Sequence, residues 1–194
     1  MADLGSLCVY CGSSTGVDPA HGEAARRLGE LMAERGVRLI FGGGRIGLMG
    51  ALADAVLAGG GSVIGVIPGH LEEREVGHRG ATELIVVGGM HERKRRMFEL
   101  ADAFAVLPGG LGTLDETLEI ITWRQLGLHD KPLVLVDDGG YWAPLRGLLE
   151  HIVERGFARP DTRALYTIVG SVDDVFDAVA AAPAPRRPAQ EELL

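Results

Sequence analysis

Short apolar runs alternate with longer amphipathic segments along nearly the whole chain. The short runs predict buried strands, whereas apolar residues that recur every three or four positions, such as Leu48, Leu52 and Val56, predict helices. Strands are expected at residues 6–11, 37–41, 62–67, 83–87, 103–107, 132–136 and 166–169. Helices are expected at residues 19–35, 46–58, 90–100, 113–126, 141–155 and 172–180.

This alternation predicts an α/β fold, in which a mostly parallel sheet of about seven strands carries helices on both faces. Glycines follow several expected strands, at Gly12, Gly42–Gly44, Gly69 and Gly109–Gly110. Ligands of such sheets bind outside the carboxyl ends of the strands, so we expect these turns to converge on one ligand-binding edge. Residues 1–182 are expected to form a single domain, and the proline-containing residues 183–194 to form a tail without fixed structure.

Charge and composition exclude some classes of function. The 194-residue chain has a net charge of −8, which argues against nonspecific binding to nucleic acid. No apolar run reaches the roughly 18 residues that span a bilayer, and the first residues do not form a signal peptide. We therefore expect a soluble cytoplasmic protein with no membrane partner. Cys8 and Cys11 have C-x-x-C spacing, but their place at a strand favours a structural role, and no metal site is predicted.

The segment from Leu107 to Glu116 is the strongest functional signal. Three glycines lie between an expected strand and an expected helix, where the backbone can approach a ligand closely and the helix start favours an anion. Glu116 would stand beside that anion. Thr113 and Glu116 also have the spacing of a capping box, with Thr113 as N-cap and Glu116 as its partner. Both interpretations of Glu116 are open at this point.

Two further segments contain candidate ligand contacts. Residues 42–47 satisfy G-x-G-x-x-G, but no acidic residue follows about 20 positions on to hold a ribose, so a phosphate-binding or close-packing role is favoured over NAD or FAD. Arg93 and Lys94 lie near the start of a helix after a strand, where an arginine could clamp a phosphate or carboxylate. Glu75 lies in the long connection between Gly69 and Gly80; alone, such a residue is typically a solvated charge.

On these motifs the sequence resembles the LOG ("lonely guy") family of cytokinin riboside 5′-monophosphate phosphoribohydrolases, which have often been labelled lysine decarboxylases. Residues 108–116 match P-G-G-x-G-T-x-x-E in full, and residues 90–94 match M-H-x-R-K. The resemblance covers roughly residues 6–180. It implies a Rossmann-like three-layer sandwich, a homodimer with sites near the interface, and no cofactor.

The resemblance also implies an activity, the hydrolysis of the N-glycosidic bond of a purine nucleoside 5′-monophosphate to free base and ribose 5-phosphate. It implies Arg93 and Glu116 as the catalytic pair. The residues expected to contact substrate, from the resemblance and the glycine turns together, are Gly43, Gly44, Glu75, Lys94, Gly109, Gly110, Leu111, Gly112, Thr113, Leu114, Asp115 and Thr122.

Two other functions remain in view. A lysine decarboxylase would usually hold pyridoxal phosphate on a lysine, and the chain offers only Lys94 and Lys131, neither in a recognisable cofactor motif. A nucleotide or molybdenum-cofactor carrier could keep the same anion cradle without hydrolysing its ligand. The complete pair of signature motifs favours the hydrolase over both.

Overall fold

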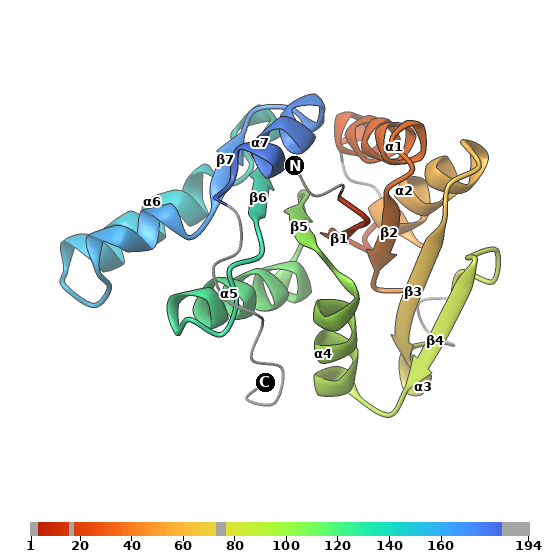
Figure 1. Cartoon of the computed structure of the whole chain (residues 1–194), viewed down its shortest axis with the longest axis horizontal. Helices are drawn as coiled ribbons and strands as arrows, with labels where there is room; N and C mark the ends of the chain where they lie inside the picture. Colours follow the sequence, from red (N-terminus) through yellow and green to blue (C-terminus); the bar gives the residue numbers. More distant parts are fainter. Residues whose placement is uncertain (1–3, 16–17, 73–76, 184–194) are drawn as a thin grey trace.

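A computed structural model describes residues 4–15, 18–72 and 77–183. All seven expected strands and six expected helices are present, with ends displaced by a few residues at most (Figure 1). The strands are β1 (Ser6–Tyr10), β2 (Arg38–Phe41), β3 (Val63–Pro68), β4 (Glu83–Val87), β5 (Ala103–Val106), β6 (Leu133–Val136) and β7 (Thr167–Val169). The α-helices are α1 (Pro19–Glu34), α2 (Gly47–Ala58), α3 (Gly69–Glu72), α4 (Met90–Leu100), α5 (Leu111–Gln125), α6 (Ala143–Glu154) and α7 (Val175–Ala181), of which the short α3 is an addition to the prediction.

The seven strands form one parallel sheet in the order β4-β3-β2-β1-β5-β6-β7. From β1 the chain winds outward to the edge strand β4, and α4 then carries it back to β5, on the other side of β1. Leu7 of β1 accordingly pairs with Leu39 of β2 on one side and with Ala103 of β5 on the other. The winding reverses at β1, and in such sheets the crevice at that reversal is where ligands bind.

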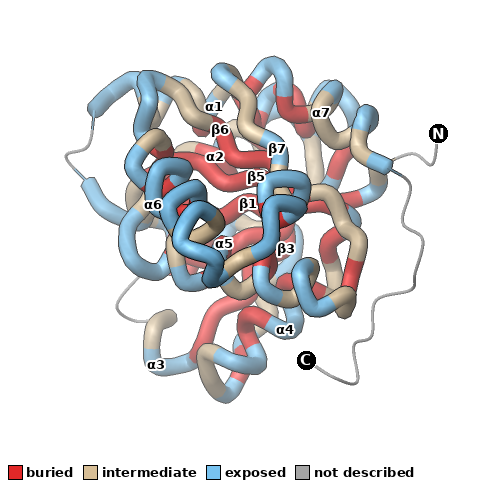
Figure 2. Tube along the Cα trace, turned by 90° about the vertical axis from the view of Figure 1, so that its left-hand side faces the viewer, coloured by how far each residue is buried: buried red, intermediate tan, exposed pale blue. Residues whose placement is uncertain are grey.

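Helices bury apolar side chains against both faces of the sheet. On one face α1, α2 and α7 pack against the strands, through residues such as Leu28 and Leu52. On the other face α4, α5 and α6 pack through residues such as Phe98, Ile120 and Leu149. The inner strands are buried between these layers, the edge strands β4 and β7 are more exposed, and the outer helix surfaces are exposed (Figure 2). The predicted three-layer arrangement is therefore confirmed.

Some predicted features lie outside the described residues, and some observed elements were not predicted. Glu75 lies outside the described residues, as do residues 184–194 of the expected tail. Short 3-10 helices, which the sequence did not predict, follow several strands and helices: η1 (Asp138–Gly140), η2 (Pro160–Ala164) and η3 (Val172–Asp174). Within the described ranges, none of the helices combines the length and apolar character needed to cross a bilayer.

Candidate active site

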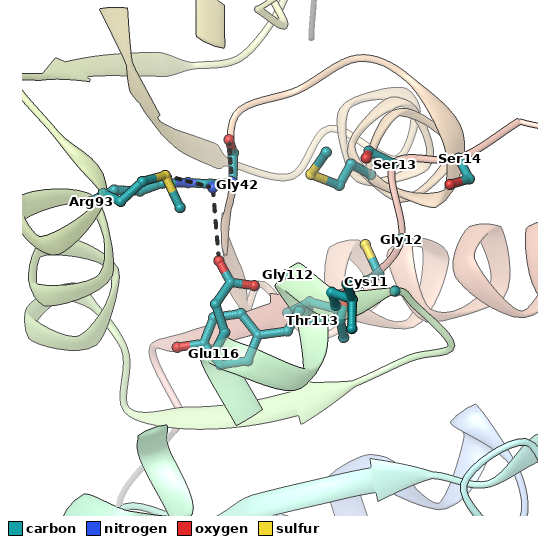
Figure 3. Close-up of a pocket in the computed structure, with 15 residues that line it drawn as sticks. Cys11, Gly12, Ser13, Ser14, Gly42, Arg93, Gly112, Thr113 and Glu116 are labelled. Atoms are coloured by element: carbon teal, nitrogen blue, oxygen red, sulfur yellow. Dashed lines mark hydrogen bonds and ion pairs between the residues drawn. The ribbon is translucent and has the colours of Figure 1, made fainter. Parts of the chain in front are cut away.

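A cavity of about 250 Å³ opens at the carboxyl edge of the sheet, beside the strand at which the winding reverses. Its walls come from the ends of β1 and β2, the starts of α4 and α5, and α2 (Figure 3). The predicted convergence of the glycine turns is thus confirmed for the turns after β1, β2 and β5. The lining residues are Val9, Tyr10, Cys11, Gly12, Ser13, Ser14, Gly42, Met49, Met90, Arg93, Gly110, Leu111, Gly112, Thr113 and Glu116.

The start of α5 forms one wall of this cavity and corrects the expected capping box. The helix begins at Leu111, its N-cap is Gly110, and no side chain caps it. Thr113 is therefore inside the first turn, where its side chain is buried, and the T-x-x-E spacing falls within the helix. The capping-box interpretation of Thr113 and Glu116 is wrong because the backbone enters the helix two residues earlier than predicted. The first N–H groups of α5 have no partner within the helix, as expected of an anion-binding end.

Arg93 and Glu116 meet in the cavity from α4 and α5 (Figure 3). Arg93 Nη1 lies 3.9 Å from Glu116 Oε1, an ion pair too long for a direct hydrogen bond. Both residues are more than nine-tenths buried, Arg93 with 6% and Glu116 with 8% of its surface exposed. The predicted neighbours are therefore brought together as opposite charges in a poorly solvated place, where electrostatic interactions are stronger than in water.

Backbone carbonyl groups hold the Arg93 guanidinium in place. Nη2 donates to the carbonyl oxygen of Gly42 at 3.0 Å, and Nε donates to that of Val66 at 3.1 Å. A Cβ at position 42 would collide with Nη2, so glycine is needed there for the arginine to reach its position. Gly42 thus serves close packing around Arg93, one of the two roles predicted for that loop.

Lys94 faces a different direction from Arg93. Its Nζ lies 2.9 Å from Glu119 Oε1 and 3.2 Å from Asp115 Oδ2, so it links α4 to α5. Partial burial acts to lower the pKa of Lys94, but the hydrogen bonds and charges of the two carboxylates outweigh it and raise the pKa. Neither Lys94 nor Asp115 lines the cavity. Their position indicates a brace between the two helices that bear Arg93 and Glu116.

Other predicted contact residues also lie away from the cavity lining. Gly43 adopts a positive φ of 77° and packs against the side chains of Ile67 and Leu84. Gly44 pairs with Gly77 in an isolated antiparallel bridge. The three remaining positions, Gly109, Leu114 and Thr122, do not line the cavity either, and the Thr122 hydroxyl donates to the carbonyl oxygen of Leu118.

Sequence reasoning missed the contribution of the first strand. Ser13 and Ser14 follow β1 and are exposed at the cavity wall opposite the start of α5 (Figure 3). The Gly12 carbonyl accepts from the N–H of Leu48 at 3.0 Å, which ties this turn to the first turn of α2. Serine hydroxyls in a turn after a strand can donate hydrogen bonds to an anion, so the run Gly12-Ser13-Ser14 was a usable signal.

Cys11 also lines the cavity, at the end of β1. Burial raises the pKa of its thiol, and the negative charge of Glu116 raises it further. A thiol held protonated in this way is a poor nucleophile and a poor metal ligand. Cys8 is likewise buried and forms no disulfide. Among the described residues, no group of three or more His, Cys, Asp or Glu side chains is arranged to hold a metal ion.

Comparison with known sequences connects this cavity to a family. A family profile described as "Possible lysine decarboxylase" matches residues 49–179. A cytokinin riboside 5′-monophosphate phosphoribohydrolase from Rhodococcoides fascians is 45% identical over 175 residues, which cover 90% of this chain and 88% of that relative. A protein of the same name from Arabidopsis thaliana is 44% identical over 169 residues, which cover 87% of this chain and 79% of that relative.

Solved structures with similar folds are more distant in sequence. The molybdenum cofactor binding protein of Rippkaea orientalis superposes with a TM-score of 0.68 at 20% identity, covering 93% of this chain and 98% of that chain. The molybdenum cofactor carrier protein of Chlamydomonas reinhardtii gives 0.69 at 20% identity, covering 90% of this chain and 95% of that chain. At this identity the likeness shows the fold alone, and it confirms the Rossmann-like architecture.

Proposed function

This chain belongs to the LOG family of cytokinin riboside 5′-monophosphate phosphoribohydrolases, and on that premise we propose that it hydrolyses the N-glycosidic bond of adenosine 5′-monophosphate or its N6-prenylated forms. The products would be the free base and ribose 5-phosphate. The observation that carries this proposal is that one cavity contains both the N-terminus of α5 and the buried pair Arg93 and Glu116. The N-terminus of α5 suits a phosphate, and the Glu116 carboxylate suits a carbon that develops positive charge.

The 5′-phosphate would lie at the start of α5. Gly110, Leu111 and Gly112 line the cavity there, and the first N–H groups of a helix together with its dipole favour an anion. Ser13 and Ser14, on the opposite wall, would add hydroxyl donors. We assign the phosphate to this end because it offers donors without a carboxylate.

Glu116 would act at the sugar. Breaking the bond between C1′ and the base develops positive charge on the ribose, as in other glycoside cleavages. A carboxylate near that carbon stabilises the charge and can orient or deprotonate the attacking water. Arg93, held by two carbonyl oxygens, places a positive charge opposite Glu116 in the cavity.

The lysines of the chain do not fit the decarboxylase description. Lys94 is engaged by two carboxylates, and Lys131 Nζ donates to the Phe98 carbonyl oxygen at 2.7 Å and lies 3.9 Å from the centre of the Phe98 ring. Neither lysine lines the cavity. A lysine that binds pyridoxal phosphate must reach the substrate, and neither of these does.

Two substrates test the proposed reaction. The purified protein is incubated separately with AMP and with isopentenyladenosine monophosphate, and released base and ribose 5-phosphate are measured by chromatography. The proposal expects both products in equal amounts from at least one substrate. Tight binding of nucleotide without any released base would overturn it and favour a carrier function.

We further propose that two copies associate through α5, near the cavity. Leu111, Leu118 and Leu126 of this segment are 85%, 38% and 67% exposed, an unusual apolar content for a solvated helix surface. Leu111 belongs both to this surface and to the cavity lining, so the proposed interface continues into the site. A second copy seated there would cover the leucines and close one side of the cavity.

A further inference from the structure

Tyr141 reaches the glycine turn from outside the cavity. Its hydroxyl donates a hydrogen bond of 2.7 Å to the carbonyl oxygen of Gly109, and Tyr141 itself does not line the cavity. We propose that Tyr141 is a positioning residue that orients the anion-binding backbone at the start of α5. This inference rests on the proposed function. No sequence motif considered above includes Tyr141.

The turn after β6 presents Tyr141 in a fixed direction. Gly139 and Gly140 have positive φ values of 65° and 78°, a conformation that glycine adopts without strain. The Asp137 carboxylate accepts the backbone N–H of Trp142 at 2.6 Å, which closes the turn. Trp142 is buried in the core. The residue after Tyr141 is thus anchored twice, so the tyrosine backbone has little freedom to move.

The ring of Tyr141 is also packed between aromatic neighbours. Its centroid lies 5.5 Å from that of His21 in α1 and 4.9 Å from that of Trp142, both in edge-on arrangements. These contacts restrict the ring even though the residue is 41% exposed. A rigidly held hydroxyl loses little entropy when it donates to Gly109.

Because the peptide bond is planar, the hydrogen bond to the Gly109 carbonyl also orients the N–H group of Gly110. The Gly109 carbonyl and the Gly110 N–H belong to one trans peptide, in which the two groups point in opposite directions. Tyr141 fixes the carbonyl on the outer side, so the Gly110 N–H is directed the other way, toward the cavity that Gly110 lines. Gly110 is the N-cap of α5, so this peptide sets how the helix start meets the anion.

The turn needs such an external tether because it has no side chains of its own. A Cβ on Gly109 would collide with the Thr113 side chain, so the position must be glycine, and glycine loses the most conformational freedom on ordering. The Gly12 N–H donates to the Pro108 carbonyl at 3.0 Å and fixes the turn before Gly109. The Tyr141 hydroxyl fixes the same turn one residue later, at the Gly109 carbonyl.

The variant Tyr141→Phe removes only the hydroxyl and tests the assignment. Tyr166→Phe is the matched control, since Tyr166 is half-buried on the β7 side and away from the cavity. Affinity for ribose 5-phosphate is measured by calorimetry, KM and kcat are measured with AMP, and thermal melting is recorded for both variants. From the loss of one hydrogen bond we expect affinity to fall and KM to rise by about 3- to 10-fold in Tyr141→Phe. Its kcat should change by less than about twofold, because the bond acts on phosphate binding rather than on Glu116.

The outcomes separate this inference from the proposed function. Unchanged affinity and KM in a folded Tyr141→Phe protein would overturn the inference, as would an equal loss in Tyr166→Phe. If the unmodified protein binds ribose 5-phosphate but releases no base from either AMP or isopentenyladenosine monophosphate, the proposed reaction is wrong. The affinity ratio of the two variants still decides the role of Tyr141 in that case.

Discussion

Arg93 and Glu116 face each other at 3.9 Å while Arg93 makes its short hydrogen bonds elsewhere, to two backbone carbonyl oxygens. The arginine is thus positioned by the main chain and not by its acidic partner. Exchange of Glu116 should therefore leave Arg93 in place. This separation makes the two residues independently testable.

Glu116→Gln should lower kcat for base release by about 100-fold or more, because the amide can neither accept a proton nor stabilise positive charge on the sugar. The protein should stay folded, since Glu116 is not part of the cap of α5. Rates with AMP and thermal melting measure the two effects. Glu99→Gln, on the surface of α4, is the control and should keep full activity. A fully active Glu116→Gln protein would refute the assigned role.

Gly42→Ala should displace the Arg93 guanidinium, because the added methyl group would occupy the place of Nη2. Misplacement of a positioning group commonly costs about 10- to 100-fold in kcat/KM, and we expect a loss of that size. Gly147→Ala is the matched control. A Cβ there meets nothing within 4 Å, and the exchange in α6 should stabilise the fold by about 0.5–1 kcal/mol. Equal kinetics for both variants would contradict the packing role of Gly42.

Lys94→Met should destabilise the fold as well as slow catalysis. It leaves Asp115 and Glu119 without their shared cation and loosens the contact between α4 and α5. Because Asp115 is 58% and Glu119 24% exposed, solvent reduces the cost of breaking the pair, and we expect about 1–2 kcal/mol in urea unfolding. Arg95→Met, which breaks only an exposed pair with Glu99, should cost less than half as much. An unchanged unfolding free energy with a large rise in KM would instead indicate a direct substrate contact.

The stability of the protein should depend on pH through His129. Burial lowers the pKa of His129 from 6.5 to about 4, and its ring is hydrogen-bonded to the Ile120 carbonyl and the Lys131 N–H. The folded state thus binds fewer protons than the unfolded state between these values. The contribution is fully present above pH 6.5 and is lost progressively as the pH falls toward 4, by about 3 kcal/mol in all.

Urea unfolding between pH 7.5 and pH 4.5 measures this loss. His129→Gln should flatten the dependence, whereas His151→Gln, an exposed histidine of α6, should retain it. A steep dependence that survives in His129→Gln would assign it to other groups.

Leu126→Lys should weaken self-association. A charge on the proposed apolar interface must be desolvated in a dimer but not in a monomer. Sedimentation velocity of the unmodified protein should show a dimer that Leu126→Lys shifts toward monomer. Phe157→Lys alters an apolar residue that is 87% exposed after α6 and should leave the dimer intact. A monomeric unmodified protein would refute the interface.

Much of this molecule follows from its sequence. The alternation of short apolar runs with amphipathic segments predicts every strand, because the inner strands are buried between the helix layers and the more exposed edge strands β4 and β7 also contain short apolar runs. The glycine turns also mark the cavity edge, because at Gly42 and Gly109 the neighbouring protein atoms leave no room for a Cβ. Arg93 and Glu116 could be singled out as candidates because both lie near the start of a helix that follows a strand, whereas their role as a catalytic pair was implied by the family resemblance and stays a prediction.

The errors have a local cause. The start of α5 was misplaced because the T-x-x-E spacing of a capping box also occurs inside this helix, whose first turn contains Gly112, a residue with weak helix propensity. The direction of individual side chains could not be predicted from the sequence either. Arg93 and Lys94 are adjacent in the chain, yet Arg93 enters the cavity and Lys94 binds carboxylates of α5. Tyr141 depends on a contact across the fold with Gly109, which no spacing within one segment reveals.

The reversal of winding at β1 has a thermodynamic consequence. One wall of the cavity belongs to the half of the sheet that ends in β4, and the opposite wall belongs to the half that ends in β7. A molecule bound between these walls is a non-covalent cross-link between the two halves of the sheet. Occupancy should therefore slow amide hydrogen exchange on both sides at once, in β2 as well as in α5, and unfolding of either half would require its release.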